Sequence, residues 1–202
     1  MTPNNYFTTL TTRNFLYPQS RIVARLLLEN KSKKEISIQL KESNLFQLKS
    51  KDRIERFTNT IISRLSYLSE GMIQSFLSTD PLTSKAILLY GILRSDALFY
   101  EWMREVVWEK KRILDWTLYR RETEQFLERK EEQSEKVRSW NNETKTRLTN
   151  AYHQVLLESG YGIKTEQGIT LQFPFIEPSV KKQFLSIGQD RIVEIILGEV
   201  LA

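Results

Sequence analysis

The chain contains no cysteine and few residues that interrupt regular structure. Its 202 residues include 7 glycines and 5 prolines. The absence of cysteine excludes disulfides and thiolate metal sites, and it fits a reducing compartment. The scarcity of glycine and proline disfavours an all-β chain, which needs many turns, and favours helices. We therefore predict a mostly α-helical protein.

Long apolar segments are also missing. The longest uninterrupted apolar run covers 86–93, whereas a membrane-spanning helix needs about 20 residues. The start of the chain, MTPNNYFTTL, lacks both the basic and the apolar part of a signal peptide. The composition, 40% hydrophobic and 27% charged, is typical of a folded chain. We expect a soluble cytoplasmic protein without a membrane partner.

Motifs for catalysis and for cofactor binding are scarce as well. His153 is the only histidine and no obvious nucleophile accompanies it, so we expect a solvated or hydrogen-bonded side chain. No phosphate-binding loop of the GxxxxGK[ST] or GxGxxG type is present. Glu101, Glu105 and Glu109 share a helical face and leave a Mg²⁺-dependent nuclease as an alternative. We predict no enzyme activity, no cofactor, no metal and no small-molecule substrate.

Positive charge is concentrated in the first third of the chain. Residues 1–69 hold 12 Lys and Arg against 5 Asp and Glu, a net charge of +7. Residues 70–202 hold 18 against 20, a net charge of −2, which accounts for the total of +5. Charge distributed in this way steers a polyanion to one region. The alternative is a surface that only keeps the protein soluble.

Apolar periodicity and capping residues predict the order of the elements. Helices are expected over 21–29, 32–43, 50–68, 71–78, 81–96, 96–113, 117–140 and 142–159. A small β-hairpin is expected over 163–176, and two short helices, broken at Gly188, over 178–202. We predict a compact multi-helix bundle made of a basic region (1–70), apolar central helices (71–118) and a C-terminal helical region (119–202).

The segment NLFQLKSKDRIERFTNTIISRL, residues 44–65, belongs to a first helix-turn-helix candidate. Ser32 to Ser43 would form its first helix and Ser50 to Leu68 its second. One apolar stripe at spacings of three and four is expected to be buried: Ile54, Phe57, Ile61, Leu65 and Leu68. The start of this second helix carries most of its positive charge.

The same segment supplies the candidate DNA contacts. Phosphate binding needs cations and backbone N–H groups that converge where helices start, and the residues of this kind are Lys31, Lys33, Lys34, Lys49, Ser50 and Lys51. Arg53 and Arg56 suit guanine edges, and Asn59 suits adenine. The alternative is that both arginines pair with Asp52 or Glu55 on their own helix.

A second helix-turn-helix candidate lies in the C-terminal region. It comprises the segment ending near Trp140, the helix 142–159 and the hairpin 163–176 as a wing. Its candidate contacts are Thr144, Lys145 and Arg147. Because its surroundings are nearly neutral, the pattern favours DNA contact here less than in the first candidate.

Four segments, in this order, resemble a known family: NFLYPQSRIVARLLLE, NLFQLKSKDRIERFTNTIISRL, LYGILRSDALFYEWMREVVWEK and EQSEKVRSWNNETKTRLTNAYHQVLLESG. The chain is similar to the BrxA family of bacteriophage-exclusion (BREX) defence systems, mainly from Asn14 to Gly160. The resemblance rests on overall pattern rather than on a catalytic signature. It implies a compact helical fold, likened to that of the antitermination factor NusB, and DNA binding in the cytoplasm beside other proteins of the system.

Together these features predict a non-enzymatic protein that binds double-stranded DNA in phage defence, with other phage-exclusion proteins as further partners. A protein-binding scaffold remains an alternative, in which the exposed helix 120–138 and the wing dock other components. RNA binding is a third possibility, which the likeness to NusB suggests. No stacking motif for single strands supports it, and we expect Tyr6, Phe7 and Phe15 to be packing residues.

Overall fold

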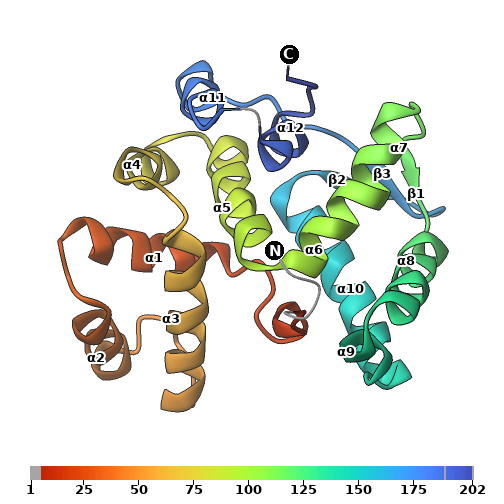
Figure 1. Ribbon diagram of the computed structural model, residues 1–202. Coiled ribbons are helices and arrows are strands. Elements are labelled where there is room, and N and C mark those ends of the chain that lie inside the picture. Colours follow the sequence, from red (N-terminus) through yellow and green to blue (C-terminus); the bar gives the residue numbers. More distant parts are fainter. Residues whose placement is uncertain (1–5, 189, 202) are drawn as a thin grey trace.

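The computed structural model describes residues 6–188 and 190–201 (Figure 1). Residues 1–5, in the start of the chain that lacks the features of a signal peptide, and residues 189 and 202 lie outside the described part. The first half contains a 3₁₀ turn η1 (Thr9–Thr11) and the helices α1 (Tyr17–Leu28), α2 (Lys33–Ser43), α3 (Lys51–Leu65), α4 (Glu70–Ser78) and α5 (Pro81–Ser95).

The second half combines helices with a small sheet. Its helical elements are α6 (Ala97–Trp102), a π-helical turn η2 (Met103–Trp108), α7 (Glu109–Arg112), α8 (Arg120–Gln133), α9 (Glu135–Arg138), α10 (Asn142–Ser159), α11 (Pro178–Leu185) and α12 (Arg191–Leu197). Its strands are β1 (Thr117–Leu118), β2 (Gly162–Lys164) and β3 (Ile169–Leu171). The predicted mostly α fold with a small C-terminal hairpin is confirmed.

Local capping starts α2 and α3 where the sequence predicts them, whereas α1 begins at Tyr17, four residues before the predicted start at Arg21. The Ser32 hydroxyl accepts a hydrogen bond from the Glu35 amide at 3.3 Å, and the Ser32 amide donates to the Glu35 carboxylate at 2.8 Å. The Ser50 hydroxyl accepts from the Arg53 amide at 3.3 Å. These bonds satisfy amides that have no partner within their helices. The starts of α2 and α3 are therefore determined by a few neighbouring residues.

Helix α5 lies at the centre of the fold. It contacts α1, α3, α4, α10 and α12, and the apolar stripe of α3 is buried as predicted. A Cβ atom at Gly91 would lie 2.5 Å from the Arg64 carbonyl oxygen, so glycine permits α3 to approach α5 closely. Leu82 is 43% exposed because it lies in the first turn of α5, at the edge beside Gly160.

The segment 117–140, predicted as one helix, is divided into three elements. Thr117 and Leu118 form β1, which pairs antiparallel with Thr170 and Ile169 of β3. Helix α8 ends at Gln133, and Ser134, which has an extended backbone, caps the start of α9. The helical prediction for the start of this segment is wrong because pairing with a strand some 50 residues later overrides local helix propensity.

The predicted hairpin is formed by β2 and β3. Together with β1 they make a three-stranded antiparallel sheet in the order β1–β3–β2. The two predicted short helices at the end of the chain are α11 and α12, and Gly188 between them has a left-handed backbone, with φ of +95°. No helix in residues 6–188 or 190–201 combines the length and apolar character needed to cross a membrane.

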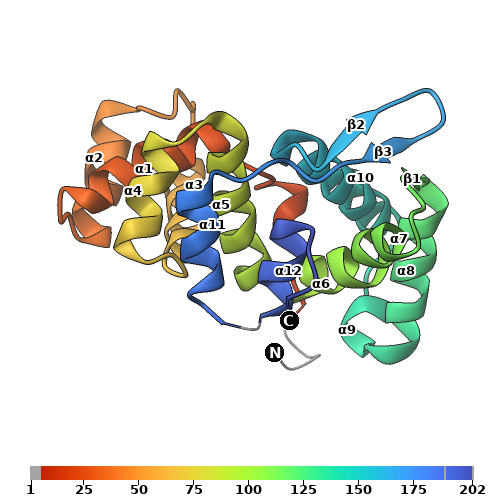
Figure 2. The same cartoon turned by 90° about the horizontal axis from the view of Figure 1, so that it is seen from above.

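The two helix-turn-helix candidates lie on opposite sides of the molecule. In both views α1–α4 gather on one side and α8–α10 with the sheet on the other (Figures 1 and 2). Helices α5, α6 and α12 lie between them. The two candidate surfaces are therefore separate.

Candidate nucleic-acid interface

Helices α1, α2 and α3 pack against one another and present a basic outer surface. The stripe of α3 that contains Ile54 and Ile61 is buried. Amphipathic periodicity therefore turns most of the polar side chains of this helix outward, whereas Thr58 and Arg64 are buried. Those predicted as contacts and exposed here are Lys51, Arg53, Arg56 and Asn59, and Lys33, Lys34, Lys49 and Ser50 are exposed at the nearby helix starts.

Lys31 differs from the other candidate cations. Its ammonium group pairs with the Glu29 carboxylate at 2.5 Å and donates to the Gln39 side chain at 2.8 Å. An ion pair with a neighbouring carboxylate cancels most of the field that a phosphate would experience. Lys31 is therefore less available to an anion than Lys33 or Lys34.

Arg53 and Arg56 do not pair with the acids of their own helix in the described part of the chain. Glu55 instead binds Lys41 of α2 at 2.7 Å, which lowers the pKa of that carboxyl. The Arg53 guanidinium lies over the Phe57 ring, 5.2 Å from its centroid. The positive charge of both arginines thus remains available to a ligand.

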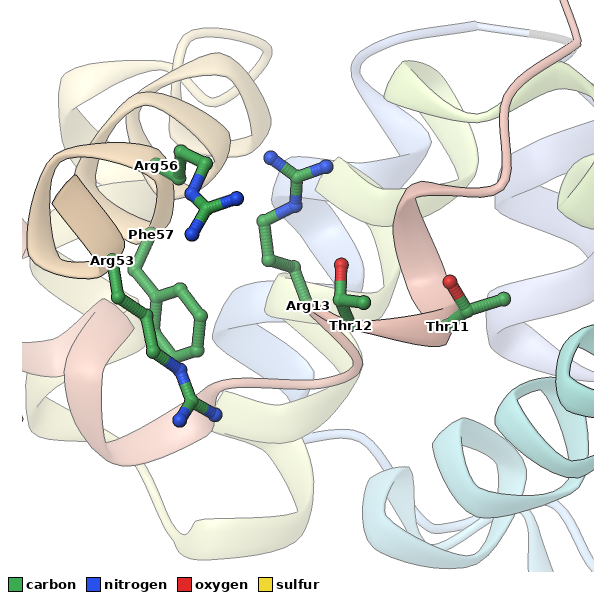
Figure 3. Close-up of a pocket in the computed structure, with 6 residues that line it drawn as sticks. All are labelled: Thr11, Thr12, Arg13, Arg53, Arg56 and Phe57. Carbon is green, nitrogen blue, oxygen red and sulfur yellow. The ribbon is translucent and has the colours of Figure 1, made fainter. Parts of the chain in front are cut away.

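The structure brings a third arginine to this place. Arg13, directly after η1, lines a pocket of about 390 Å³ together with Thr11, Thr12, Arg53, Arg56 and Phe57 (Figure 3). The Arg56 side chain extends toward the Arg13 guanidinium, so that the two groups lie near one another (Figure 3). Burial and the nearby Arg56 charge both lower the pKa of Arg13. The spacing of 40 positions between Arg13 and Arg53 gives no sequence signal for this cluster.

Asn59 lies in a neighbouring hollow of about 290 Å³ between α3 and the N-terminal segment. Phe7 and Thr9 form the opposite wall. Phe7, predicted as a packing residue, is 50% exposed, whereas Tyr6 and Phe15 are buried as predicted. The difference arises because Tyr6 turns inward, where its hydroxyl donates to the Glu101 carboxylate at 2.9 Å. The next residue, Phe7, then faces the surface.

A buried arginine of α3 holds the segment that carries Arg13. The Arg64 guanidinium donates to the backbone carbonyl of Arg13 at 2.5 Å and to that of Asn14 at 2.6 Å. Burial lowers the pKa of Arg64 to about 10, so it stays charged at neutral pH. Burial also raises the pKa of the nearby Asp96 to about 6. Helix α3 therefore contributes Arg53, Arg56 and Phe57 to the pocket lining. Through Arg64 it also holds the segment that carries Arg13.

The second candidate presents fewer available cations. Lys145 pairs with Glu131 at 2.5 Å, and Arg147 pairs with Glu143 at 2.6 Å. Thr144 is half-buried, and its amide is bound by Asn141, which caps α10. The hollow beside Lys145 is also lined by Glu124, Glu128 and Glu131. The surface of α10 is consequently less positive than that of α3.

The carboxylates considered for a nuclease are ion-paired. Lys130 binds Glu101 at 2.6 Å and Glu105 at 3.0 Å, and Arg112 binds Glu109 at 2.9 Å. The π-helical turn η2 lies between the first and last of these acids and alters their helical spacing. Within residues 6–188 and 190–201, no three His, Cys, Asp or Glu side chains are grouped as a metal site.

His153 is hydrogen-bonded, as expected. Its Nε2 lies 2.8 Å from the Thr123 hydroxyl, which also accepts from the Trp102 indole at 3.1 Å. Burial lowers the pKa of His153 to about 4. The imidazole is therefore neutral at physiological pH and takes part in packing between α6, α8 and α10.

Comparisons with known proteins extend over nearly the whole chain. The family model of BrxA matches residues 4–187. A curated relative from Bacillus cereus (strain H3081.97), described as "BREX protein BrxA", is 32% identical over 197 residues, covering 96% of this chain and 97% of the relative. A crystal structure of an uncharacterized protein from Magnetospirillum magneticum shares the fold, with a TM-score of 0.79 and 20% identity over 95% of this chain and 97% of that one.

Proposed function

The chain belongs to the BrxA family of the bacteriophage-exclusion (BREX) defence system, and from this premise we propose that it is a non-enzymatic cytoplasmic protein that binds double-stranded DNA. The observation that carries this proposal is the group of Arg13, Arg53 and Arg56, which face one pocket without a carboxylate among its lining residues. Duplex DNA presents closely spaced phosphates, and clustered uncompensated cations are what its binding requires.

The arrangement of the N-terminal helices supports a helix-turn-helix interpretation. Helices α2 and α3 are joined by a short turn and pack together on α1. Lys49 and Lys51 flank the capped start of α3, where backbone N–H groups also favour an anion. In this proposal the start of α3 and the start of α2 contact phosphates, while Arg53, Arg56 and Asn59 lie nearest to the bases.

The C-terminal unit is proposed as a weaker second contact. Its order of strand β1, helices α8 and α10, and hairpin β2–β3 supports the interpretation of a winged unit. The ion pairs of Lys145 and Arg147 compensate its charge. We propose that it contributes less to DNA affinity than α3 does.

Binding to labelled duplex DNA, single-stranded DNA and duplex RNA, measured by fluorescence anisotropy at several salt concentrations, tests the proposed function. The variant Lys51/Arg53/Arg56→Ala is expected to bind duplex DNA roughly tenfold or more weakly. The slope of log affinity against log salt should fall by about 2 to 3, because each phosphate contact contributes about 0.9.

A charge-matched variant provides the control for this experiment. Arg129 of α8, Lys136 of α9 and Lys182 of α11 are exposed and do not belong to helices α1–α3. The variant Arg129/Lys136/Lys182→Ala loses the same charge and should keep most of the affinity and the salt slope. Equal losses in both variants, or none in either, would contradict the assignment of α3. Stronger binding of RNA than of duplex DNA would favour the RNA alternative.

A scaffold function is the second candidate, and one observation favours it. Ile113 and Leu114, which lie between α7 and strand β1 in the chain, are 72% and 71% exposed. Exposed neighbouring apolar side chains are typical of protein contacts. Co-purification of other BREX proteins from cells, with and without nuclease treatment, separates the two functions. An association that survives nuclease treatment but is lost in Ile113/Leu114→Ser supports the scaffold.

A further inference from the structure

The pocket between η1 and α3 has the chemistry of an oxyanion site. Its polar lining consists of the arginines Arg13, Arg53 and Arg56, the Thr12 hydroxyl, and Thr11, whose hydroxyl proton is already donated to the Thr8 carbonyl. Among residues 6–188 and 190–201, those that line the pocket include no carboxylate. Like charges in close proximity repel, and the proximity of Arg56 is one reason why the pKa of Arg13 is lowered. A bound anion would relieve this repulsion.

One donor in the pocket wall lacks a partner. The Nε atom of Arg13 is buried and makes no hydrogen bond to any residue in the described part of the chain. A buried donor without an acceptor is unfavourable, and in native proteins it usually bonds to water or to a ligand. Arg13 therefore has hydrogen-bonding capacity that the folded chain leaves unused.

The pocket is also preorganised. The two bonds from Arg64 to the carbonyls of Arg13 and Asn14 fix the backbone from which the Arg13 side chain extends. The Thr11 hydroxyl donates to the Thr8 carbonyl at 2.7 Å and stabilises η1. The Arg53 side chain runs along the Phe57 ring, and its guanidinium lies over the face of that ring (Figure 3). Side chains held in place before a ligand arrives lose less entropy when it binds.

We propose that this pocket binds a single phosphate group, with Arg13 and Arg56 as the principal ligands and Arg53 as the third cation. The planar fork of N–H donors on each guanidinium matches the oxygen atoms of a phosphate. Two sources share this chemistry, namely a phosphodiester within a DNA strand and a phosphomonoester at a strand end. The inference deepens the proposed function and rests on it for the nucleic-acid source of the phosphate.

The pocket is tested first without nucleic acid, with inorganic phosphate as the probe. Thermal unfolding of the full chain is followed while phosphate replaces chloride at constant ionic strength. The wild type should be stabilised progressively, and Arg13→Gln and Arg56→Gln should each require about ten times more phosphate for the same shift, because each removes a charge-assisted contact. Arg129→Gln, which removes the same charge from α8, should respond like the wild type.

Neither arginine substitution is expected to disturb the fold, so a changed phosphate response can be attributed to the pocket. Arg56 is exposed, and the backbone carbonyl of Arg13 that Arg64 binds is unchanged in Arg13→Gln. If wild type, Arg13→Gln and Arg56→Gln are all stabilised equally by phosphate, phosphate does not bind in this pocket and the proposal is wrong. If duplex DNA still binds in that case, the proposed function survives. If phosphate binding depends on Arg13 but the protein does not bind duplex DNA, the phosphate site is supported and the proposed function is contradicted.

The source of the phosphate is determined with two duplexes of equal length. One has 5′-phosphorylated ends, and the other is closed by hairpin loops and has no ends. Backbone recognition predicts that Arg13→Gln weakens binding to both by the same factor. Recognition of an end predicts a loss only on the open duplex. No loss on either duplex would overturn the nucleic-acid source of the phosphate.

Discussion

Arg64 is buried, and its guanidinium donates to backbone carbonyls rather than to a carboxylate. It connects α3 to the segment after η1 and so positions Arg13. Asp96 is the buried acid whose charge acts on Arg64. At the scale of single residues, the binding surface thus depends on a buried cation that no surface pattern reveals.

The titration of His153 makes the stability of the protein depend on pH. Its pKa is lowered to about 4 in the folded protein from a usual value of 6.5. Between these two values the unfolded chain binds a proton that the folded protein does not, so stability falls as the pH falls from 6.5 toward 4. The stability that a neutral His153 provides is therefore fully present only above pH 6.5.

We expect His153→Gln to remove this dependence. On lowering the pH from 7.5 to 5.0, the wild type should lose about 2 kcal/mol of unfolding free energy more than the variant. Urea unfolding at the two pH values measures this difference. Asp96 titrates in the same range with the opposite sign, but it is common to both proteins and cancels in the comparison. Parallel pH profiles would show that His153 is not the titrating group.

Helix α3 combines two functions on its two sides. One side packs on α5 and α1, and the other carries the arginines of the pocket. The close approach of α3 to α5 depends on Gly91, where a Cβ atom would meet backbone rather than a flexible side chain. The position of the arginines relative to Arg13 therefore depends on a contact on the opposite side of the helix.

Gly91→Ala is expected to lower the free energy of unfolding by about 1–3 kcal/mol, because the added methyl group forces α3 away from α5. The matched control is Gly71→Ala on α4, where an added Cβ atom meets no atom within 4 Å. This control should stabilise the protein by about 0.5–1 kcal/mol, because alanine favours a helix. Urea unfolding measures both changes, and a neutral Gly91→Ala would mean that the two helices adjust without cost.

The whole molecule places a basic unit and a more neutral unit on opposite sides of α5 and α12 (Figure 2). This arrangement permits contact with two separate stretches of a ligand, or with DNA on one side and a protein on the other. The distribution of ion pairs favours the N-terminal side for DNA, since the cations of α10 are compensated.

Lys145/Arg147→Ala therefore should weaken duplex binding by less than about threefold, because paired surface charges contribute little. The comparison with Lys51/Arg53/Arg56→Ala is made by anisotropy under one salt condition, after circular dichroism has shown that both variants are folded. A larger loss in the α10 variant would transfer the principal contact to the winged unit.

The sequence by itself determined most of the helices and the exposed basic side of α3. The capping box of Ser32, the cap at Ser50 and the apolar stripe of Ile54 and Ile61 depend on residues within a few positions of each other. Helix periodicity and capping are local, so these features can be read directly from the chain.

Only the tertiary structure decided which distant residues meet. It placed Arg13 beside Arg56, paired β1 with β3 and buried Tyr6 while exposing Phe7. It also compensated Lys145 with Glu131 from another helix. Each of these outcomes depends on contacts between residues far apart in the chain. The energies of such contacts depend on how whole helices and strands pack, not on the residues next to each other in the sequence.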